Sequence, residues 1–123
     1  MAERARVGVL VPNLFLRVPV DAAVRGAGAE PETVAGVAAA ASAPRVLGVD
    51  LDALGAEPET AVRALVVQGK DVLAFGPHVK AQMLAACRAA GAVVLPRSVF
   101  LARLPELLAA ALGPAHRPAA SED

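Results

Sequence analysis

Short apolar runs alternate with longer segments of helical pattern along this chain, and that alternation limits its fold more than any other feature. Four runs are rich in valine and leucine and lack a regular polar alternation, which is typical of strands buried on both faces. The runs are RVGVLV (6–11), RVLGVDL (45–51), DVLAF (71–75) and AVVLP (92–96). Helical spacing of apolar residues fills the segments 14–27, 32–44, 57–70, 79–91 and 99–112. The pattern predicts an α/β fold in which helices cover both faces of a parallel sheet.

Three places in this pattern are less regular. AEPETV (29–34) fits a fifth strand, although it carries two acids and a proline, and the hexapeptide GAEPET that overlaps it recurs at 55–60. Pro19 interrupts the first helical segment, so that helix either starts near Val18 or is kinked, because an interior proline costs about 3 kcal/mol. Pro105 could kink or shorten the last helix in the same way. With the fifth strand included, we expect a three-layer αβα sandwich around five parallel strands.

The composition and the length of the chain exclude several classes of protein. A length of 123 residues fits one domain, at 1–112, and the segment 113–123 has the composition of a flexible tail. Twelve basic and twelve acidic residues give no net field toward nucleic acid or membrane, and three Phe without Tyr or Trp exclude base-stacking platforms. No apolar run approaches the roughly 20 residues of a membrane span, and the N-terminus does not resemble a signal peptide. We therefore expect a soluble cytoplasmic protein.

The single cysteine, Cys87, excludes an internal disulfide and a multi-cysteine zinc site. It lies in the middle of a predicted helix among alanines, which favours a small core residue. The alternative, a reactive thiol, has no support from the neighbouring residues.

Three stretches of the chain resemble the receiver domain of response regulators, which has a flavodoxin-like fold. PRVLGVDL (44–51) is similar to the third strand of that domain, DVLAFGP (71–77) to the fourth, and AAGAVVLPRSVFLARLPELL (89–108) to the fifth strand and last helix. The resemblance extends over about 5–112. It implies the strand order 2-1-3-4-5, and it places Asp50 where the phosphorylated aspartate of a receiver would be.

The chain departs from the receiver pattern around that aspartate. Two acids that help to hold Mg²⁺ at the end of the first strand are replaced by Pro12 and Asn13. The hydroxyl residue that follows the fourth strand is replaced by Gly76. The lysine that follows the fifth strand is replaced by Ser98, with Arg97 one residue earlier. The resemblance therefore implies an atypical receiver-like domain that lacks most of the phosphorylation motif.

Only Asp50 and Asp52 remain as hard oxygen ligands for Mg²⁺, so no cofactor is expected. Asp50 is either an unconventional phosphoacceptor, with Asp52 beside it, or a buried acid that binds loop amides. In the second interpretation Asp52 is a turn residue.

Ligands of open parallel sheets bind beyond the carboxyl ends of the strands. Six polar residues are expected at that edge: Asn13, Asp50, Asp52, His78, Arg97 and Ser98. His78, Arg97 and Ser98 could together bind a phosphate or carboxylate near a helix start. In the alternative interpretation His78 is a turn residue that caps a helix or pairs with an aspartate, and Ser98 is an N-cap. A Ser98/His78/Asp50 triad is a further alternative, but Ser98 lacks the G-x-S-x-G pattern of a nucleophile elbow.

Three functions remain open from the sequence. The first is a non-catalytic, stand-alone receiver-like regulatory domain that acts through a protein partner or through self-association. The second is phosphorylation of Asp50, and the third is a small-anion-binding protein or enzyme that uses His78, Arg97 and Ser98. A homodimer is also expected, because receiver domains commonly associate through their fourth and fifth strand–helix units. The consecutive apolar residues at 99–101 of that region cannot all face one core.

Overall fold

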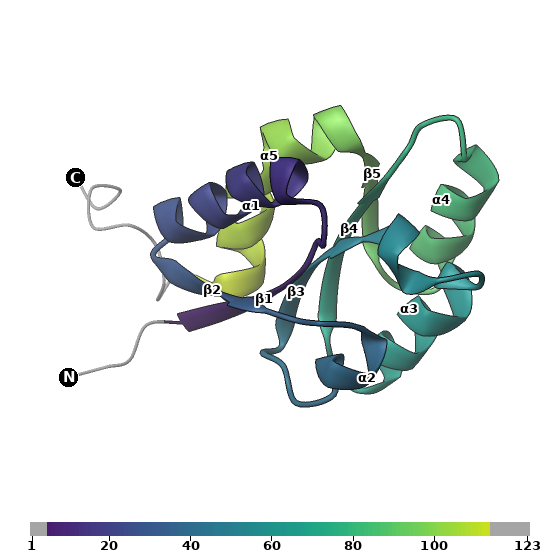
Figure 1. Ribbon diagram of the computed structural model, residues 1–123, viewed down its shortest axis with the longest axis horizontal. Helices are drawn as coiled ribbons and strands as arrows, with labels where there is room; N and C mark the ends of the chain where they lie inside the picture. Colours follow the sequence, from purple (N-terminus) through teal and green to yellow (C-terminus); the bar gives the residue numbers. More distant parts are fainter. Residues whose placement is uncertain (1–4, 114–123) are drawn as a thin grey trace.

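The computed structural model describes residues 5–113 and arranges them in three layers (Figure 1). Five strands form the middle layer: β1 (Ala5–Leu10), β2 (Ala29–Thr33), β3 (Val46–Asp50), β4 (Asp71–Gly76) and β5 (Val93–Pro96). They pair in the order β2-β1-β3-β4-β5, and every pair is parallel. The predicted α/β sandwich and its strand order are confirmed.

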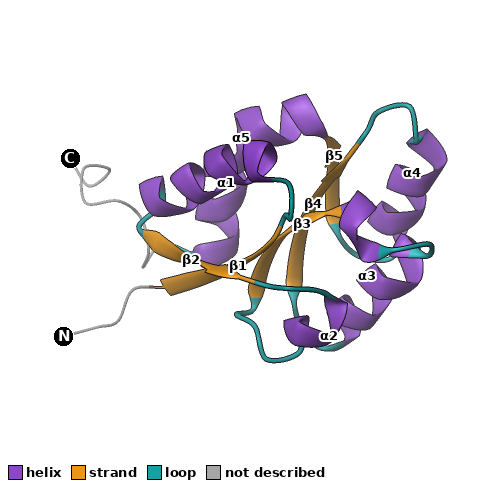
Figure 2. Ribbon diagram, in the orientation of Figure 1, coloured by secondary structure: helices purple, strands orange, loops and turns teal. Residues whose placement is uncertain are grey.

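Helices cover both faces of the sheet (Figure 2). One face carries α1 (Leu14–Gly26) and α5 (Arg97–Leu112). The other face carries the remaining helical segments, which are α2 (Val37–Ala40), the 3-10 helix η1 (Leu51–Leu54), α3 (Pro58–Val67) and α4 (Ala81–Ala89). Because both faces are covered, β3 is buried along its whole length, and its carboxyl end brings Asp50 to the edge of the sheet.

The two cores differ in composition. Under α1 and α5, the rings of Phe75 and Phe100 lie 5.0 Å apart between their centroids, among valines and leucines. Under α2, α3 and α4, the core consists of valine, leucine and alanine together with the thiol of Cys87. Small side chains of this kind let helices and sheet approach closely.

The first helix begins earlier than the proline suggested. The Asn13 side chain accepts hydrogen bonds from the backbone N–H groups of Phe15, at 2.9 Å, and Leu16, at 3.4 Å, so α1 starts at Leu14. This cap satisfies donors of the first turn and stabilises a helix start that precedes Pro19. Pro19 lies inside α1, and Pro105 lies inside α5 without ending it.

The second helix is shorter than the predicted segment 32–44. Glu32 and Thr33 belong to β2, and the Val34 N–H donates to the Val9 carbonyl at 3.0 Å. Residues 32–34 therefore form backbone hydrogen bonds with β1, although the sequence pattern assigned them to a helix. Only the four residues from Val37 to Ala40 form α2.

Part of the chain lies outside the described residues. The expected tail, from residue 114 onward, is in that part, and so is His116. Between residues 5 and 113, no helix combines the length and the apolar character that crossing a bilayer requires.

Candidate functional site

Asp50 is the buried acid at the carboxyl edge of the sheet, at the end of β3. It is 8% exposed, and its Oδ1 accepts a hydrogen bond of 3.0 Å from the backbone N–H of Asp52. That bond makes Asp50 the N-cap of η1. Burial raises the pKa of the Asp50 carboxyl, while the hydrogen bond from Asp52 and the charges of Arg97 and Lys80 oppose the rise. This geometry matches the interpretation of Asp50 as a buried acid that accepts a hydrogen bond from a loop amide.

Asp52 forms the ion pair of this edge. Lys80 Nζ, from the loop between β4 and α4, lies 2.9 Å from Asp52 Oδ1, and both side chains are partly exposed. Sequence reasoning missed Lys80, although a lysine four residues after the end of β4 falls at the same edge as the two acids. The pair ties the loop before α4 to the end of β3, so Asp52 has a cation contributed by the chain itself.

The end of β4 is closed by apolar side chains. A Cβ atom placed on Gly76 would lie 2.8 Å from Leu84 Cδ2 and 3.3 Å from Met83 Cε. It would also lie 3.6 Å from Leu51 Cδ1. These atoms are terminal methyl groups from α4 and η1, so a hydroxyl side chain at this position would have to displace them.

Asn13 has a structural role at the end of β1. Its side-chain oxygen caps α1, as described above. A ligand at this edge would have to compete with that cap for the same oxygen.

A shallow cavity of about 350 Å³ brings three of the predicted residues together. It is lined by Pro77, His78, Val79, Pro96, Arg97 and Ser98. His78 lies in the turn before α4, and Arg97 and Ser98 open α5, so the β4–α4 turn and the junction of β5 with α5 form the walls. Asp50 is not among the lining residues, although its carboxyl group lies close enough to Arg97 for their charges to interact.

Two local predictions at this cavity are wrong. Ser98 is the second residue of α5 rather than its N-cap, because the helix starts at Arg97 directly after Pro96. His78 does not cap α4 either, since Lys80 is the N-cap residue and the helix starts at Ala81. Both side chains are exposed.

The donor atoms at the acidic edge do not fit the Mg²⁺ ion that a receiver-like fold implies. Magnesium prefers several charged oxygens in a near-octahedral arrangement. Here one Asp50 oxygen accepts a backbone N–H, and Asp52 is paired with Lys80. Among residues 5–113 there is no group of three His, Cys, Asp or Glu side chains that could hold a metal ion.

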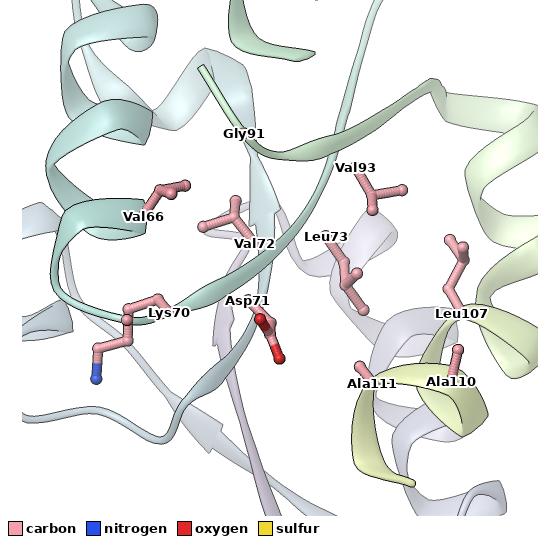
Figure 3. A pocket seen from close by; sticks show the side chains of 11 residues that line it. Val66, Lys70, Asp71, Val72, Leu73, Gly91, Val93, Leu107, Ala110 and Ala111 are labelled. Atoms are coloured by element: carbon pink, nitrogen blue, oxygen red, sulfur yellow. The ribbon is translucent and has the colours of Figure 1, made fainter. Parts of the chain in front are cut away.

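A larger hollow of about 430 Å³ lies at the opposite edge, where β4 and β5 begin (Figure 3). Leu73, Val93 and Leu107 gather on one side of it, and Val66 and Val72 lie on the other. The charged groups at its rim already have partners. Lys70 Nζ donates to the Ala43 carbonyl at 2.6 Å, and Asp71 pairs with Arg45. Sequence reasoning missed this hollow, whose walls are mainly apolar and whose charged side chains already have partners within the chain.

Cys87 is buried in α4, as expected for a core residue. Burial raises the pKa of its thiol, with a smaller contribution from the charge of Glu59. A raised pKa lowers the fraction of reactive thiolate, so the geometry favours a packing role.

Several solved structures with the same architecture are response regulators, whereas no protein-family model and no curated protein sequence matches the chain. The phosphorylated cyanobacterial phytochrome response regulator RcpA has a TM-score of 0.70 at 11% identity, over 95% of this chain and 100% of that one. A Thermotoga maritima response regulator has a TM-score of 0.66 at 16% identity, over 87% and 99%.

The same likeness extends to part of a longer protein. NtrX from Brucella abortus has a TM-score of 0.67 at 14% identity, over 89% of this chain and 28% of that one. Identities this low carry the fold and not the chemistry. The chain has the fold of a response-regulator receiver domain.

Proposed function

We propose that this chain is a receiver-like regulatory domain that acts through protein association and does not use Mg²⁺-dependent phosphorylation of Asp50. The proposal rests on the observation that other side chains of the chain already contact the carboxyl ends of β3 and β4. Leu84 and Met83 occupy the space beside Gly76, and Lys80 neutralises Asp52. A phosphoryl group on Asp50 would meet apolar side chains where a hydroxyl donor would be needed.

The charge balance of the edge supports the same proposal. Phosphoryl transfer to a carboxylate requires stabilisation of several negative oxygens, which a metal ion usually supplies. The two acids here already have the neighbouring charges of Lys80 and Arg97. A domain with this edge can still carry regulatory information, because its outer helix faces remain available to other proteins. The proposal includes a cytoplasmic location, which suits a chain whose single thiol is buried and reduced.

Intact mass spectrometry with a small acyl-phosphate donor and Mg²⁺ tests the proposal. We expect no phosphoryl adduct on the wild-type chain over a time course that fully modifies a receiver domain with the complete motif. Asp50→Asn and Asp52→Asn serve as matched variants. An adduct on the wild-type chain and on Asp52→Asn that is absent from Asp50→Asn would establish a phosphoacceptor and overturn the proposal.

A second candidate function is binding of a small anion in the cavity between the β4–α4 turn and the start of α5. The specific observation is that His78, Arg97 and Ser98 line one cavity of about 350 Å³. Arg97 would supply fixed charge and paired donors for an oxyanion. Asp50 opposes this function, because its negative charge lies close enough to Arg97 for the two to interact.

Sulfate titration followed by amide NMR measures this second function. Arg97→Ala should remove most of the affinity, because Arg97 supplies the fixed charge, and His78→Ala should weaken binding less. Shifts that do not saturate would leave His78 as a turn residue.

A further inference from the structure

The outer side of α1 carries an unusual apolar stripe. The Phe15 side chain is 91% exposed, and the neighbouring side chains of Leu14 and Val18 are exposed as well. Pro19 and Ala22 continue the exposed face along the helix. Phe15, Val18, Pro19 and Ala22 follow the spacing of one helix face, so they form a continuous surface that we call the α1 stripe.

The fold itself does not need the α1 stripe. The opposite side of the helix, with Val20 and Val24 fully buried, already packs against the sheet and α5. Only the backbone of Phe15 takes part in the cap formed by Asn13. The other two phenylalanines are buried in the core, at Phe75 and Phe100. An exposed aromatic side chain with no packing role is typical of an interaction surface.

We propose that the α1 stripe binds the α1 stripe of a second copy of this chain, with the two helices antiparallel across a two-fold axis between Val18 and Pro19. The inference rests on the proposed function, because it names the surface and the partner of the association. It differs from the dimer expected from the sequence, which used the fourth and fifth strand–helix units.

The shape of the stripe favours pairing with itself. Large side chains, Phe15 and Val18, lie toward its start, and the exposed Ala22 and Gly26 lie toward its end. A Cβ placed on Gly26 would meet nothing within 4 Å, so that end is open. In an antiparallel pair the bulky end of each helix faces the small end of the other. Phe15 then lies over Ala22 of the second copy, as an isologous contact requires.

The charges around the stripe agree with this arrangement. Arg17 and Asp21 neutralise each other at 3.1 Å within the helix, and the whole chain has zero formal net charge, so two copies do not repel. Arg25 is the remaining exposed charge on α1. An antiparallel pair separates the two Arg25 residues by about 20 Å of helix, beyond the screening length of about 8–10 Å. A parallel pair would bring them together.

The alternative dimer surface is less apolar. On the fourth and fifth strand–helix units, the exposed large hydrophobic side chains are Val79, at 77%, Val93, at 42%, and Val99, at 41%, and none of them is aromatic. The exposed positions of α4 are mostly alanine. The α1 stripe therefore offers more apolar area to bury than this alternative surface.

The stripe is small for an interface. Two such helix faces cover less than the roughly 800 Å² per partner of a standard interface, so we expect a weak, reversible dimer with a dissociation constant on the order of 10–100 µM.

Sedimentation equilibrium between about 10 µM and 1 mM tests the proposal. Phe15→Lys should weaken the dimer at least about tenfold, since it replaces the aromatic side chain of the stripe with a charge. Val67→Lys is the matched control, because Val67 is 82% exposed at the end of α3 and lies outside the stripe. A wild-type chain that stays monomeric throughout would overturn the proposal, and so would a dimer that Val93→Lys dissociates while Phe15→Lys leaves it intact.

Cysteine cross-linking tests the two-fold geometry. Val18→Cys lies beside the proposed axis and should form a disulfide-linked dimer under mild oxidation. The wild-type chain, whose cysteine is buried, and Val67→Cys should remain uncross-linked. Equal cross-linking of Val18→Cys and Val67→Cys would contradict the proposed surface. Because the phosphorylation assay does not depend on oligomeric state, a monomer would refute this inference alone, and an Asp50 adduct would refute the proposed function alone.

Discussion

The ends of β3 and β4 lie side by side in the sheet and have opposite characters. At the end of β3, Asp50 is a buried acid held by a backbone hydrogen bond, next to the ion pair of Asp52 and Lys80. At the end of β4, Gly76 lies under the apolar ends of Leu84 and Met83. An acid that caps η1 therefore ends β3, whereas the end of β4 is part of the hydrophobic core.

This difference shows that the acid at the end of β3 has a structural role that does not depend on phosphorylation. Asp50 has a structural role as the N-cap of η1, which is sufficient to retain an acid or amide at that position. A hydroxyl side chain at position 76 would have no comparable structural role, because α4 packs directly over Gly76. A retained aspartate alone is therefore weak support for phosphorylation.

The largest expected effect concerns the apolar end of β4. Leu84→Ala should lower the free energy of unfolding by about 2–4 kcal/mol, because it removes a buried side chain and leaves a cavity beside Gly76. Urea denaturation measures the change. Leu14→Ala, at an exposed position, should change stability by less than about 0.5 kcal/mol, and equal losses in the two variants would contradict the packing described for β4.

The next effect compares two glycines within the sheet. Gly76→Ala should destabilise the chain by about 1 kcal/mol relative to Gly48→Ala, because its Cβ has to displace the terminal methyl groups of Leu84 and Met83. Gly48→Ala has only ordinary contacts, the nearest being Val20 Cγ1 at 3.8 Å, and should be neutral or slightly stabilising. Thermal unfolding of both variants tests this contrast. A Gly76→Ala variant as stable as Gly48→Ala would show that the space beside Gly76 is open.

The third effect is a pH dependence of stability that comes from Asp50 at the end of β3. Burial raises the pKa of Asp50 in the folded state, so the folded chain holds this proton more tightly than the unfolded chain. The contribution of Asp50 to stability should then fall as pH rises from the ordinary aspartate pKa of about 4 through the raised pKa, and the loss persists above it. Asp50→Asn removes the cost of burying a charged carboxylate, and it keeps an oxygen that can accept a hydrogen bond from the Asp52 N–H. Its stability relative to wild type should increase between about pH 4 and pH 7. A constant difference across that range in chemical denaturation would contradict the assignment.

The smallest expected effect belongs to the ion pair. Lys80→Ala should cost about 0.2–1 kcal/mol at low ionic strength and less at high salt, because both side chains are partly exposed. Lys70→Ala is a useful comparison, since Lys70 donates to a backbone carbonyl instead of a carboxylate. A Lys80→Ala loss that does not change with salt would contradict an electrostatic contact.

The sequence predicted most of the fold because strand patterns and turn residues act locally. The hexapeptide GAEPET illustrates this. At 28–33 it leads into and forms β2, whereas at 55–60 it leads into α3 with Pro58 as the first helical residue. Flanking residues distinguish the two copies: the first is followed by Val34, which pairs with β1, and the second by the apolar helix face of α3.

The candidate site was predicted less completely, because it depends on contacts between distant segments. The pattern placed Asp50, Asp52, His78 and Arg97 at the correct edge. It did not show that Lys80 reaches Asp52, 28 residues away, or that Leu84 closes the space over Gly76. Both contacts are set by the packing of α4, and the exposed α1 stripe likewise follows from which side of α1 faces the sheet.

The most direct test of the central claim is the amide NMR spectrum of the chain with beryllofluoride and Mg²⁺, which together mimic an aspartyl phosphate without requiring its chemical lifetime. The account predicts that the resonances of Asp50, Leu51 and Gly76 remain unchanged, because Asp52 is already paired with Lys80 and the side chains of Leu84 and Met83 lie over Gly76. Saturable shifts of these resonances in the wild-type chain, absent from Asp50→Asn, would contradict it.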